Sequence, residues 1–170
     1  MKVIRLESVN STNTYAKEKA NEIKEDVVII ANKQTDGYGT NNRKWYSDDD
    51  SIICSFLIKD KKKTIPLDYS YQIGCLVSKV INRICNVRTY VKKPNDIFFN
   101  EKKLGGVLIE TQYSLKKLDY LIIGIGINVN QKSLPEDIQE IATSLSIETG
   151  RLYKKEDIIR GLIREIENEE

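Results

Sequence analysis

The chain has 170 residues, of which 40% are hydrophobic and 31% are charged, and its formal net charge is +2. This length and composition suit one domain with a hydrophobic core of its own. The small net charge argues against a dedicated nucleic-acid-binding protein, and the absence of histidine excludes a serine triad and most zinc sites. No apolar run is long enough to span a membrane and the N-terminus has no signal-peptide pattern, so we expect a cytoplasmic protein.

The pattern of apolar residues predicts an α+β fold in which strands outnumber helices. Predicted strands cover Val3–Leu6, Val27–Ala31, Ser51–Lys59, Val87–Val91, Ile97–Phe99, a returning strand at Leu104–Ile109 and Val107–Gln112, and Leu118–Ile127. Predicted helices run from Ser11 or Thr12 to about Ile23, from about Leu67 to Ile84, and from about Lys155 to Glu167. Because short turns join most strands, we expect a mixed or antiparallel sheet with helices packed on one face.

Two other compositional features have simple interpretations. Cys54, Cys75 and Cys85 lack metal-ligand spacing and lie in apolar stretches, so they are expected to be buried free thiols in a reducing compartment. The basic run Lys59–Lys63 precedes Pro66 and is expected to be a solvated loop rather than a nucleic-acid-binding stripe.

A charged hairpin is the most informative segment of the chain. Residues 92–96 read Lys-Lys-Pro-Asn-Asp, and residues 103–107 read Lys-Leu-Gly-Gly-Val. Pro94 restricts its own φ and pushes the preceding residue toward extended geometry, so the chain turns where Asn95 and Asp96 are presented. The returning strand brings Lys103 close to Asp96, and the two glycines leave room for a ligand against the backbone. This arrangement suits a carboxylate or phosphate ligand, and a solvated turn is the alternative.

Two glycine-containing segments add to this picture. Gln34–Trp45 is a loop punctuated by glycines between two apolar runs. Ile122–Asn130 is a β-branched strand with glycine at alternate positions, which places Gly124 and Gly126 on one face.

Together with Ser11-Thr12-Asn13, these segments resemble biotin protein ligases, which adenylate biotin and transfer it to a carrier lysine. The resemblance runs from about Glu7 to Asn130 and comprises five motifs in the family's order. It implies biotin as substrate, ATP with Mg²⁺ as cofactors, and a biotin carboxyl carrier domain or accessible lysines of nearby proteins as acceptor. The small net charge and the lack of a long apolar run, rather than the resemblance, argue against a nucleic-acid or membrane partner. We expect residues 1–170 to be a single catalytic domain, without the family's N-terminal DNA-binding domain and C-terminal β-barrel.

The resemblance also assigns residues to the two substrates. Those implied to contact biotin are Ser11, Thr12, Asn13, Gln34, Gly37, Tyr38, Gly106 and Gly124. Those implied to contact ATP or the adenylate are Gly39, Thr40, Arg43, Trp45, Asn95 and Asn128, with backbone amides at the loop glycines approaching a phosphate. Plain structural roles are the alternative for several of them, such as a helix N-cap in the Ser-Thr-Asn element or a core anchor at Trp45.

Lys103 and Asp96 are the implied catalytic residues. Lys103 matches the family's lysine that contacts both the biotin carboxylate and the phosphoryl group, where a fixed ammonium offsets the repulsion between two anions. Asp96 would orient an ammonium, and it would lie near Mg²⁺ that arrives with ATP.

The loop departs from the family's Gly-Arg-Gly-Arg pattern, because Tyr38 and Thr40 stand where the family has arginine. Lys93 likewise replaces a tryptophan. An arginine–phosphate contact contributes roughly 1.5–3 kcal/mol, which a threonine hydroxyl does not reproduce. The resemblance therefore implies weak retention of biotinyl-AMP and promiscuous labelling, as in a proximity-labelling variant. Natural drift, with Arg43 or Lys93 supplying the missing charge, is the competing explanation.

Two other functions stay open at this point. A lipoate or octanoate ligase shares the chemistry of carrier-lysine modification, and a catalytically weak biotin- or adenylate-binding protein would use the same residues without turnover. We also expect the loop Asp36–Ser47 to be mobile without ligand and ordered with it.

Overall fold

The computed structural model describes residues 1–59 and 64–169. Its strands are β1 (Lys2–Val9), β2 (Val27–Gln34), β3 (Ser51–Ile58), β4 (Thr89–Lys92), β5 (Asp96–Phe99), β6 (Lys102–Ser114) and β7 (Lys117–Asn128). Its helices are α1 (Thr12–Lys19), α2 (Tyr69–Cys85), α3 (Leu145–Thr149) and α4 (Lys155–Glu169), with a short 3₁₀ turn η1 (Thr40–Asn42). The predicted strands and the three predicted helices are all present, and α3 is an addition. None of these helices is both long and apolar enough to cross a membrane.

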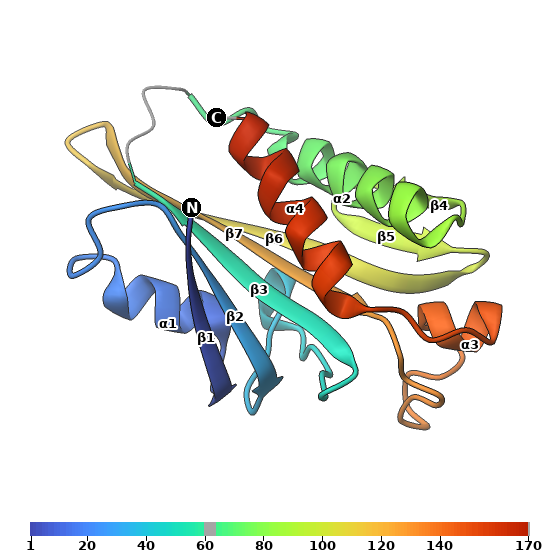
Figure 1. Cartoon of the computed structure of the whole chain (residues 1–170). Helices are drawn as coiled ribbons and strands as arrows, with labels where there is room; N and C mark the ends of the chain where they lie inside the picture. The colour runs from blue at the N-terminus through green and yellow to red at the C-terminus, as the bar shows by residue number, and fades with distance from the viewer. Residues whose placement is uncertain (60–63, 170) are drawn as a thin grey trace.

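The described strands form one seven-stranded sheet in the order β1-β2-β3-β7-β6-β5-β4 (Figure 1). β1 and β2 are parallel, with α1 as the connection between them, and every other neighbouring pair is antiparallel. The sheet is therefore mixed, which confirms the predicted α+β class. The long hairpin β6–β7 sets Gly106 opposite Gly126 and Leu108 opposite Gly124, so two of the glycine motifs lie side by side.

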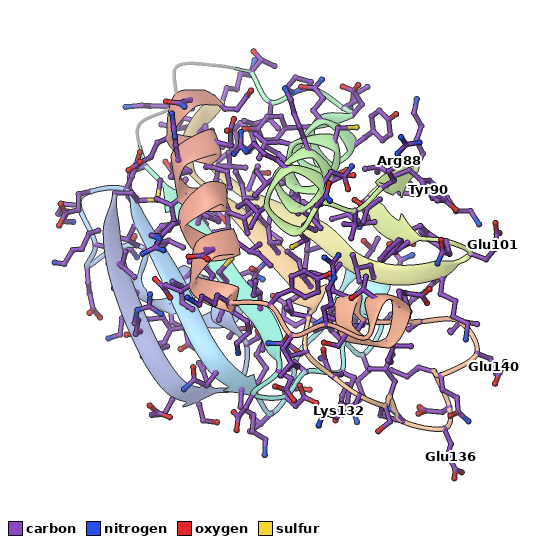
Figure 2. The ribbon with its side chains drawn as sticks, turned by 45° about the vertical axis from the view of Figure 1, so that its right-hand side comes forward. Arg88, Tyr90, Glu101, Lys132, Glu136 and Glu140 are labelled. Carbon is purple, nitrogen blue, oxygen red and sulfur yellow. The ribbon has the colours of Figure 1, made fainter. Side chains whose placement is uncertain are left out.

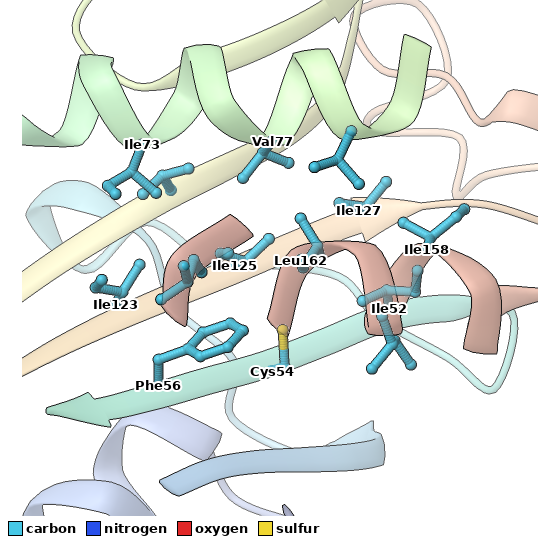
Figure 3. Close-up of a cluster of buried hydrophobic side chains, with 14 of the residues drawn as sticks. Ile52, Cys54, Phe56, Ile73, Val77, Ile123, Ile125, Ile127, Ile158 and Leu162 are labelled. Carbon is cyan, nitrogen blue, oxygen red and sulfur yellow. The ribbon is translucent and has the colours of Figure 1, made fainter. Parts of the chain in front are cut away.

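Helices cover both faces of the sheet, which corrects the expectation of a single covered face. On one face, Phe56 and Ile123 pack with α2 and α4 in the larger core cluster (Figure 3). On the other face, Leu57 and Ile122 pack against Ala16 of α1. Successive side chains of a strand point to opposite faces, and all eight positions of β3 are buried. β3 carries hydrophobic side chains on both of its faces, which indicates burial on both sides of the sheet, whereas the short, polar sequence of α1 gave little sign of a second layer.

The apolar stripe of α2 faces the core as predicted. Ile73 and Val77 are buried on this helix and lie above the side chains of the central strands (Figure 3). α4 contributes Ile158 and Leu162 to the same cluster. Burial of side chains of this size contributes about 1.5–3 kcal/mol each, so this layer supplies much of the stability of the scaffold.

The prediction of three buried thiols was wrong for Cys75, which is exposed, whereas Cys54 and Cys85 are buried. Cys75 follows the buried Ile73 by two positions, and a helix turns about 200° over that distance, which carries Cys75 to the outer face of α2. Burial raises the pKa of Cys54 to about 12. Burial also raises the pKa of Cys85, to about 11, against a smaller opposing effect of Arg151.

Charged side chains lie on the outside of the molecule, where Arg88, Glu101, Lys132 and Glu136 project away from the layers (Figure 2). The predicted basic loop begins at Lys59, and residues 60–63 lie outside the described residues. Lys59 is half-buried, and its ammonium donates to the Ala20 carbonyl at 2.6 Å, directly after α1.

Candidate active site

A cleft of about 270 Å³ lies on the α1 face of the sheet. Strands β3, β6 and β7 form its floor, the N-terminal end of α1 closes one end, and the β4–β5 turn borders the other. The loop between β2 and β3 lies over it. Every site residue implied by the sequence lines this cleft except Gly37 and Asn128.

One end of the cleft is a cluster of buried neutral polar groups. Ser11 is the N-cap of α1, and its hydroxyl accepts from the Thr14 N–H. The Thr12 N–H donates to Gln34 Oε1 at 2.8 Å, and the Ser55 hydroxyl lies 2.5 Å from Asn13 Oδ1. Hydroxyl and amide groups offer both donors and acceptors, so this end suits a neutral ligand that carries both, such as a cyclic urea.

The glycines of β7 make room for these side chains rather than forming a bare floor beneath a ligand. A Cβ at Gly124 would lie 2.3 Å from Asn13 Oδ1, and a Cβ at Gly126 would lie 2.6 Å from the Trp45 ring. Alternation along the strand puts both glycines on the cleft face. Gly124 therefore accommodates the Asn13 amide, and Gly126 accommodates the indole of the loop.

The other end of the cleft is charged. Lys103 Nζ lies 2.7 Å from Asp96 Oδ1, and both side chains are about one-third exposed, at 35% and 33%. Residues 141–143 run beside Lys103, because its N–H donates to the Ile141 carbonyl at 3.0 Å and its carbonyl accepts from the Thr143 N–H at 2.8 Å. The ammonium is thus carried on a backbone that is fixed on both sides and reaches into the cleft.

Asn128 does not line the cleft, although the resemblance assigned it to the ATP or adenylate site. It is buried outside the cleft lining, and its Nδ2 donates to the Thr143 carbonyl at 2.9 Å. This contact holds the segment that pairs with the Lys103 backbone. Asn128 is therefore set to support Lys103 from behind rather than to touch a nucleotide.

The loop over the cleft is a small hairpin. Tyr38 and Lys44 form an antiparallel bridge, the Gly39 N–H donates to the Arg43 carbonyl at 2.8 Å, and the Trp45 N–H donates to the Gly37 carbonyl at 2.8 Å. The Gly39 amide is therefore occupied within the loop, and the approach of loop amides to a phosphate stays a prediction. At the tip, Asn41 and Asn42 have φ values of 58° and 56°, in the left-handed region that asparagine tolerates better than most residues.

Three residues that the sequence reasoning did not assign lie around the polar end: Ser55, Glu110 and Lys17. Glu110 accepts hydrogen bonds from Asn13 and Tyr38, and Lys17 forms an ion pair with it. Two periodicities in the sequence point to Glu110 and Lys17. Glu110 shares the cleft face of β6 with Gly106 and Leu108, and Lys17 follows Asn13 by four positions on one helix face. Burial lowers the pKa of Lys17, but its contacts with Glu110 and Tyr38 outweigh this effect and leave the pKa raised.

Comparison with known proteins identifies the family. The sequence profile of the biotin/lipoate A/B protein ligase family matches residues 6–128, most of the chain. The chain belongs to this family. The bifunctional ligase/repressor BirA of Bacillus spizizenii is 36% identical over 162 residues, which cover 91% of this chain and 49% of that protein. BirA of Escherichia coli is 26% identical over 160 residues, 93% of this chain and 50% of its own length. The chain thus spans about half the length of these curated relatives.

A solved structure of the same family superposes on nearly the whole chain. Biotin protein ligase from Aquifex aeolicus, in complex with biotin and ATP, has a TM-score of 0.87 and 35% sequence identity. The match covers 98% of this chain and 69% of that one. The seven-stranded sheet and its helices are therefore the catalytic fold of biotin/lipoate ligases.

The structure shows the contacts of Thr40 and Lys93, which depart from the ligase pattern, and of Arg43, which was considered as a substitute cation. Thr40 Oγ1 accepts a hydrogen bond from Asn95 Nδ2 at 3.0 Å, so the loop is tied to the β4–β5 turn. Arg43 is exposed and lines the cleft, and among the described residues its guanidinium has no ion pair or hydrogen bond. Lys93 is exposed outside the cleft lining, with its ammonium 4.8 Å from the Tyr71 ring centre. Of the two cations considered as substitutes, Arg43 is therefore the one at the cleft.

Proposed function

We propose that this chain is a biotin protein ligase, which joins biotin to the adenylyl group of ATP and then transfers the biotinyl group to a lysine amine. One observation carries the proposal: a single cleft is lined by neutral polar side chains at one end and by the Lys103–Asp96 pair at the other. A ligand with a cyclic urea at one end and a carboxylate at the other matches this division of chemistry. The family supports the same assignment, and so does the likeness to the Aquifex aeolicus ligase in its complex with biotin and ATP.

In the first half-reaction, the proposed orientation places the ureido ring at Ser11, Thr12, Asn13 and Gln34 and the carboxylate beside Lys103. The carboxylate oxygen attacks the α-phosphorus of ATP, the phosphorus–oxygen bond to the leaving group breaks, and pyrophosphate departs. Both reacting groups are anionic, so a fixed ammonium between them lowers the barrier by stabilising the charge that gathers there. Asp96 holds the Lys103 ammonium in place through the 2.7 Å contact.

Mg²⁺ is proposed to arrive with ATP rather than to reside in a preformed cage. Mg²⁺ in nucleotide sites commonly takes one or two protein oxygens, with substrate phosphates and waters completing its coordination. The Asp96 carboxylate fits this requirement, and so does the Asn95 amide oxygen, which accepts no hydrogen bond from the described residues while its Nδ2 donates to Thr40 and Val107. Such an ion would neutralise phosphate charge next to these side chains.

In the second half-reaction, a neutral acceptor lysine amine attacks the carbonyl carbon of biotinyl-AMP. A carbon–nitrogen bond forms, the carbon–oxygen bond to the phosphate breaks, AMP leaves and the nitrogen loses a proton to solvent. The proposed acceptor is a biotin carboxyl carrier domain, with accessible lysines of nearby proteins as secondary targets. Asp96 is proposed to orient the incoming lysine as well as Lys103, because its carboxylate lines the cleft.

A lipoate or octanoate ligase is the second candidate, since the family includes lipoate ligases by name. A lipoate-bound structure, LipL1 of P. falciparum, is 13% identical with a TM-score of 0.58, which is a likeness of fold alone. An acyl chain needs an apolar tunnel, whereas the end of this cleft carries buried Ser11, Thr12 and Asn13. Burying these groups against an acyl chain would leave their remaining hydrogen-bonding capacity unmet, so the chemistry favours biotin.

We further propose that the intermediate is held less tightly than in ligases with an arginine at position 40. The Thr40 hydroxyl is engaged by Asn95 and bears no charge, so the phosphate of biotinyl-AMP would depend on Arg43. An adenylate that dissociates before its carrier arrives would acylate other lysines. Labelling of bystander proteins is the expected consequence.

Pyrophosphate release tests the proposal directly. With ATP and Mg²⁺ present, biotin should trigger release, and lipoate or octanoate at the same concentration should not. Release with lipoate alone would show that the second candidate is correct. Binding of biotin without any release of pyrophosphate would show a binding protein rather than a ligase.

A further inference from the structure

Glu110 joins three structural elements at the polar end of the cleft. Its Oε2 accepts from Asn13 Nδ2 at 2.8 Å and from the Tyr38 hydroxyl at 3.1 Å. Its Oε1 lies 2.6 Å from Lys17 Nζ. These partners come from α1 and from the loop over the cleft, while Glu110 itself lies on β6. One carboxylate therefore ties the helix, the loop and the sheet together.

The first consequence concerns the Asn13 amide. Its Nδ2 donates to Glu110, and its Oδ1 accepts from the Ser55 hydroxyl at 2.5 Å. The reversed amide would point its oxygen at the Glu110 carboxylate, which is repulsive. Glu110 thus fixes Asn13 with its oxygen beside Gly124, where it presents an acceptor to a ligand N–H. A neutral glutamine at position 110 would fix the orientation of the Asn13 amide less strictly, because the glutamine amide can rotate and donate a hydrogen bond to Asn13 Oδ1 in the reversed orientation.

The second consequence concerns the loop. Tyr38 lines the cleft, and its hydroxyl accepts from Lys17 Nζ at 3.0 Å while donating to Glu110. The Lys17 ammonium also lies 5.4 Å from the centre of the Tyr38 ring. The ring is therefore held at the cleft wall by a charged pair behind it. The Glu110 side chain is only 25% exposed, so removing Lys17 would leave a half-buried carboxylate without its cation.

We propose that Glu110 and Lys17 are positioning residues for the ureido end of the ligand, Glu110 by orienting Asn13 and the pair together by holding Tyr38 against the cleft. The inference rests on the proposed function, because it assumes that biotin occupies this cleft. Neither residue needs to touch the reacting atoms, which lie at the Lys103 end. Their loss should weaken ligand binding while sparing the chemical step.

Trp45 provides the readout. It is the only tryptophan of the chain and it lines the cleft, so its fluorescence should report biotin binding without turnover. The variants are Lys17→Met, Glu110→Gln and the double variant. Lys19→Met is the matched control, because Lys19 lies on the same helix and forms an exposed ion pair with Glu22 away from the cleft.

We expect each single variant to raise the biotin Kd about tenfold or more, as an unpaired or misdirected half-buried polar group would. The maximal rate of pyrophosphate release and the KM for ATP should stay within about twofold of the original chain. The double variant should bind better than Lys17→Met, because it leaves no unpaired carboxylate. A purely structural role would lower the melting temperature without this selective change in biotin affinity.

Tyr38→Phe keeps the inference testable if the charge variants fold poorly. It removes only the hydroxyl tether and leaves the ion pair intact, so the melting temperature should hold while the biotin Kd rises about three- to tenfold. Biotin affinities of Tyr38→Phe, Lys17→Met and Glu110→Gln equal to that of Lys19→Met would overturn the inference. An original chain that neither binds biotin nor releases pyrophosphate would instead overturn the proposed function itself.

Discussion

Replacing Thr40 with arginine should strengthen retention of biotinyl-AMP, but by less than the sequence alone suggests. The threonine hydroxyl accepts from Asn95 Nδ2 at 3.0 Å and ties the loop to the β4–β5 turn. Thr40→Arg removes this tie and at the same time brings a guanidinium to the mouth of the cleft. The two effects oppose each other.

The magnitude follows from their difference. A charge-assisted arginine–phosphate contact contributes about 1.5–3 kcal/mol, and a neutral surface hydrogen bond contributes about 1 kcal/mol. The net gain is about 0.5–2 kcal/mol, which corresponds to adenylate release slowed by about two- to thirtyfold. Such contacts act mainly on dissociation rates, so formation of the adenylate should change little.

The assay is a chase of preformed, radiolabelled biotinyl-AMP from the protein, followed by filter binding. Thr40→Val is the control, because it removes the hydrogen bond without adding charge, and it should release the adenylate faster than the original chain. Labelling of a lysine-rich bystander protein should rise and fall with the release rate. Equal release from all three proteins would show that position 40 does not govern retention, and Arg43 would then be the residue to test.

Three further predictions concern the loop over the cleft, Gly126 and the three thiols. Amide exchange across Asp36–Ser47 should slow when biotin and ATP are added, as measured by mass spectrometry, and unchanged exchange would argue against a lid. Gly126→Ala should displace the Trp45 ring, which lies 2.6 Å from the new Cβ position, and should raise the KM for ATP in pyrophosphate release while the circular dichroism spectrum is kept. At pH 8.5 iodoacetamide should modify Cys75 alone, because the raised pKa values of Cys54, about 12, and Cys85, about 11, keep their thiols protonated until urea unfolds the protein.

Much of the fold could be predicted because its signals are local. The largely apolar sequence of β3, the apolar stripe of α2 and the turn at Pro94 each follow from periodicity or from backbone restriction within a few residues. The proximity of Lys103 and Asp96 was predictable for the same reason, since a hairpin brings neighbouring strands together. The second helical layer was missed, because α1 buries mainly small residues such as Ala16 and carries little amphipathic signal.

The remaining features depend on contacts between distant segments. The occupied Gly39 amide and the Thr40–Asn95 tie result from how the loop folds back, which loop composition alone does not specify. Asn128 was assigned to the nucleotide side, but its amide bonds to Thr143, fifteen positions away along the chain. Lys17 and Glu110 are 93 positions apart in the sequence. Their contact depends on the register of the sheet and on the face of α1 that carries Lys17.

The measurement that tests the proposed mechanism most directly is biotin-dependent pyrophosphate release by the original chain and by Lys103→Gln. The mechanism predicts release with biotin, ATP and Mg²⁺, and a fall in rate of about a hundredfold or more in the variant if the ammonium contributes ~3 kcal/mol in the transition state. Circular dichroism should show that the variant still folds, and Trp45 fluorescence should show that biotin still binds, more weakly because its carboxylate has lost the ammonium. Unchanged turnover in a folded Lys103→Gln protein would contradict the central claim that adenylation takes place at the charged end of this cleft.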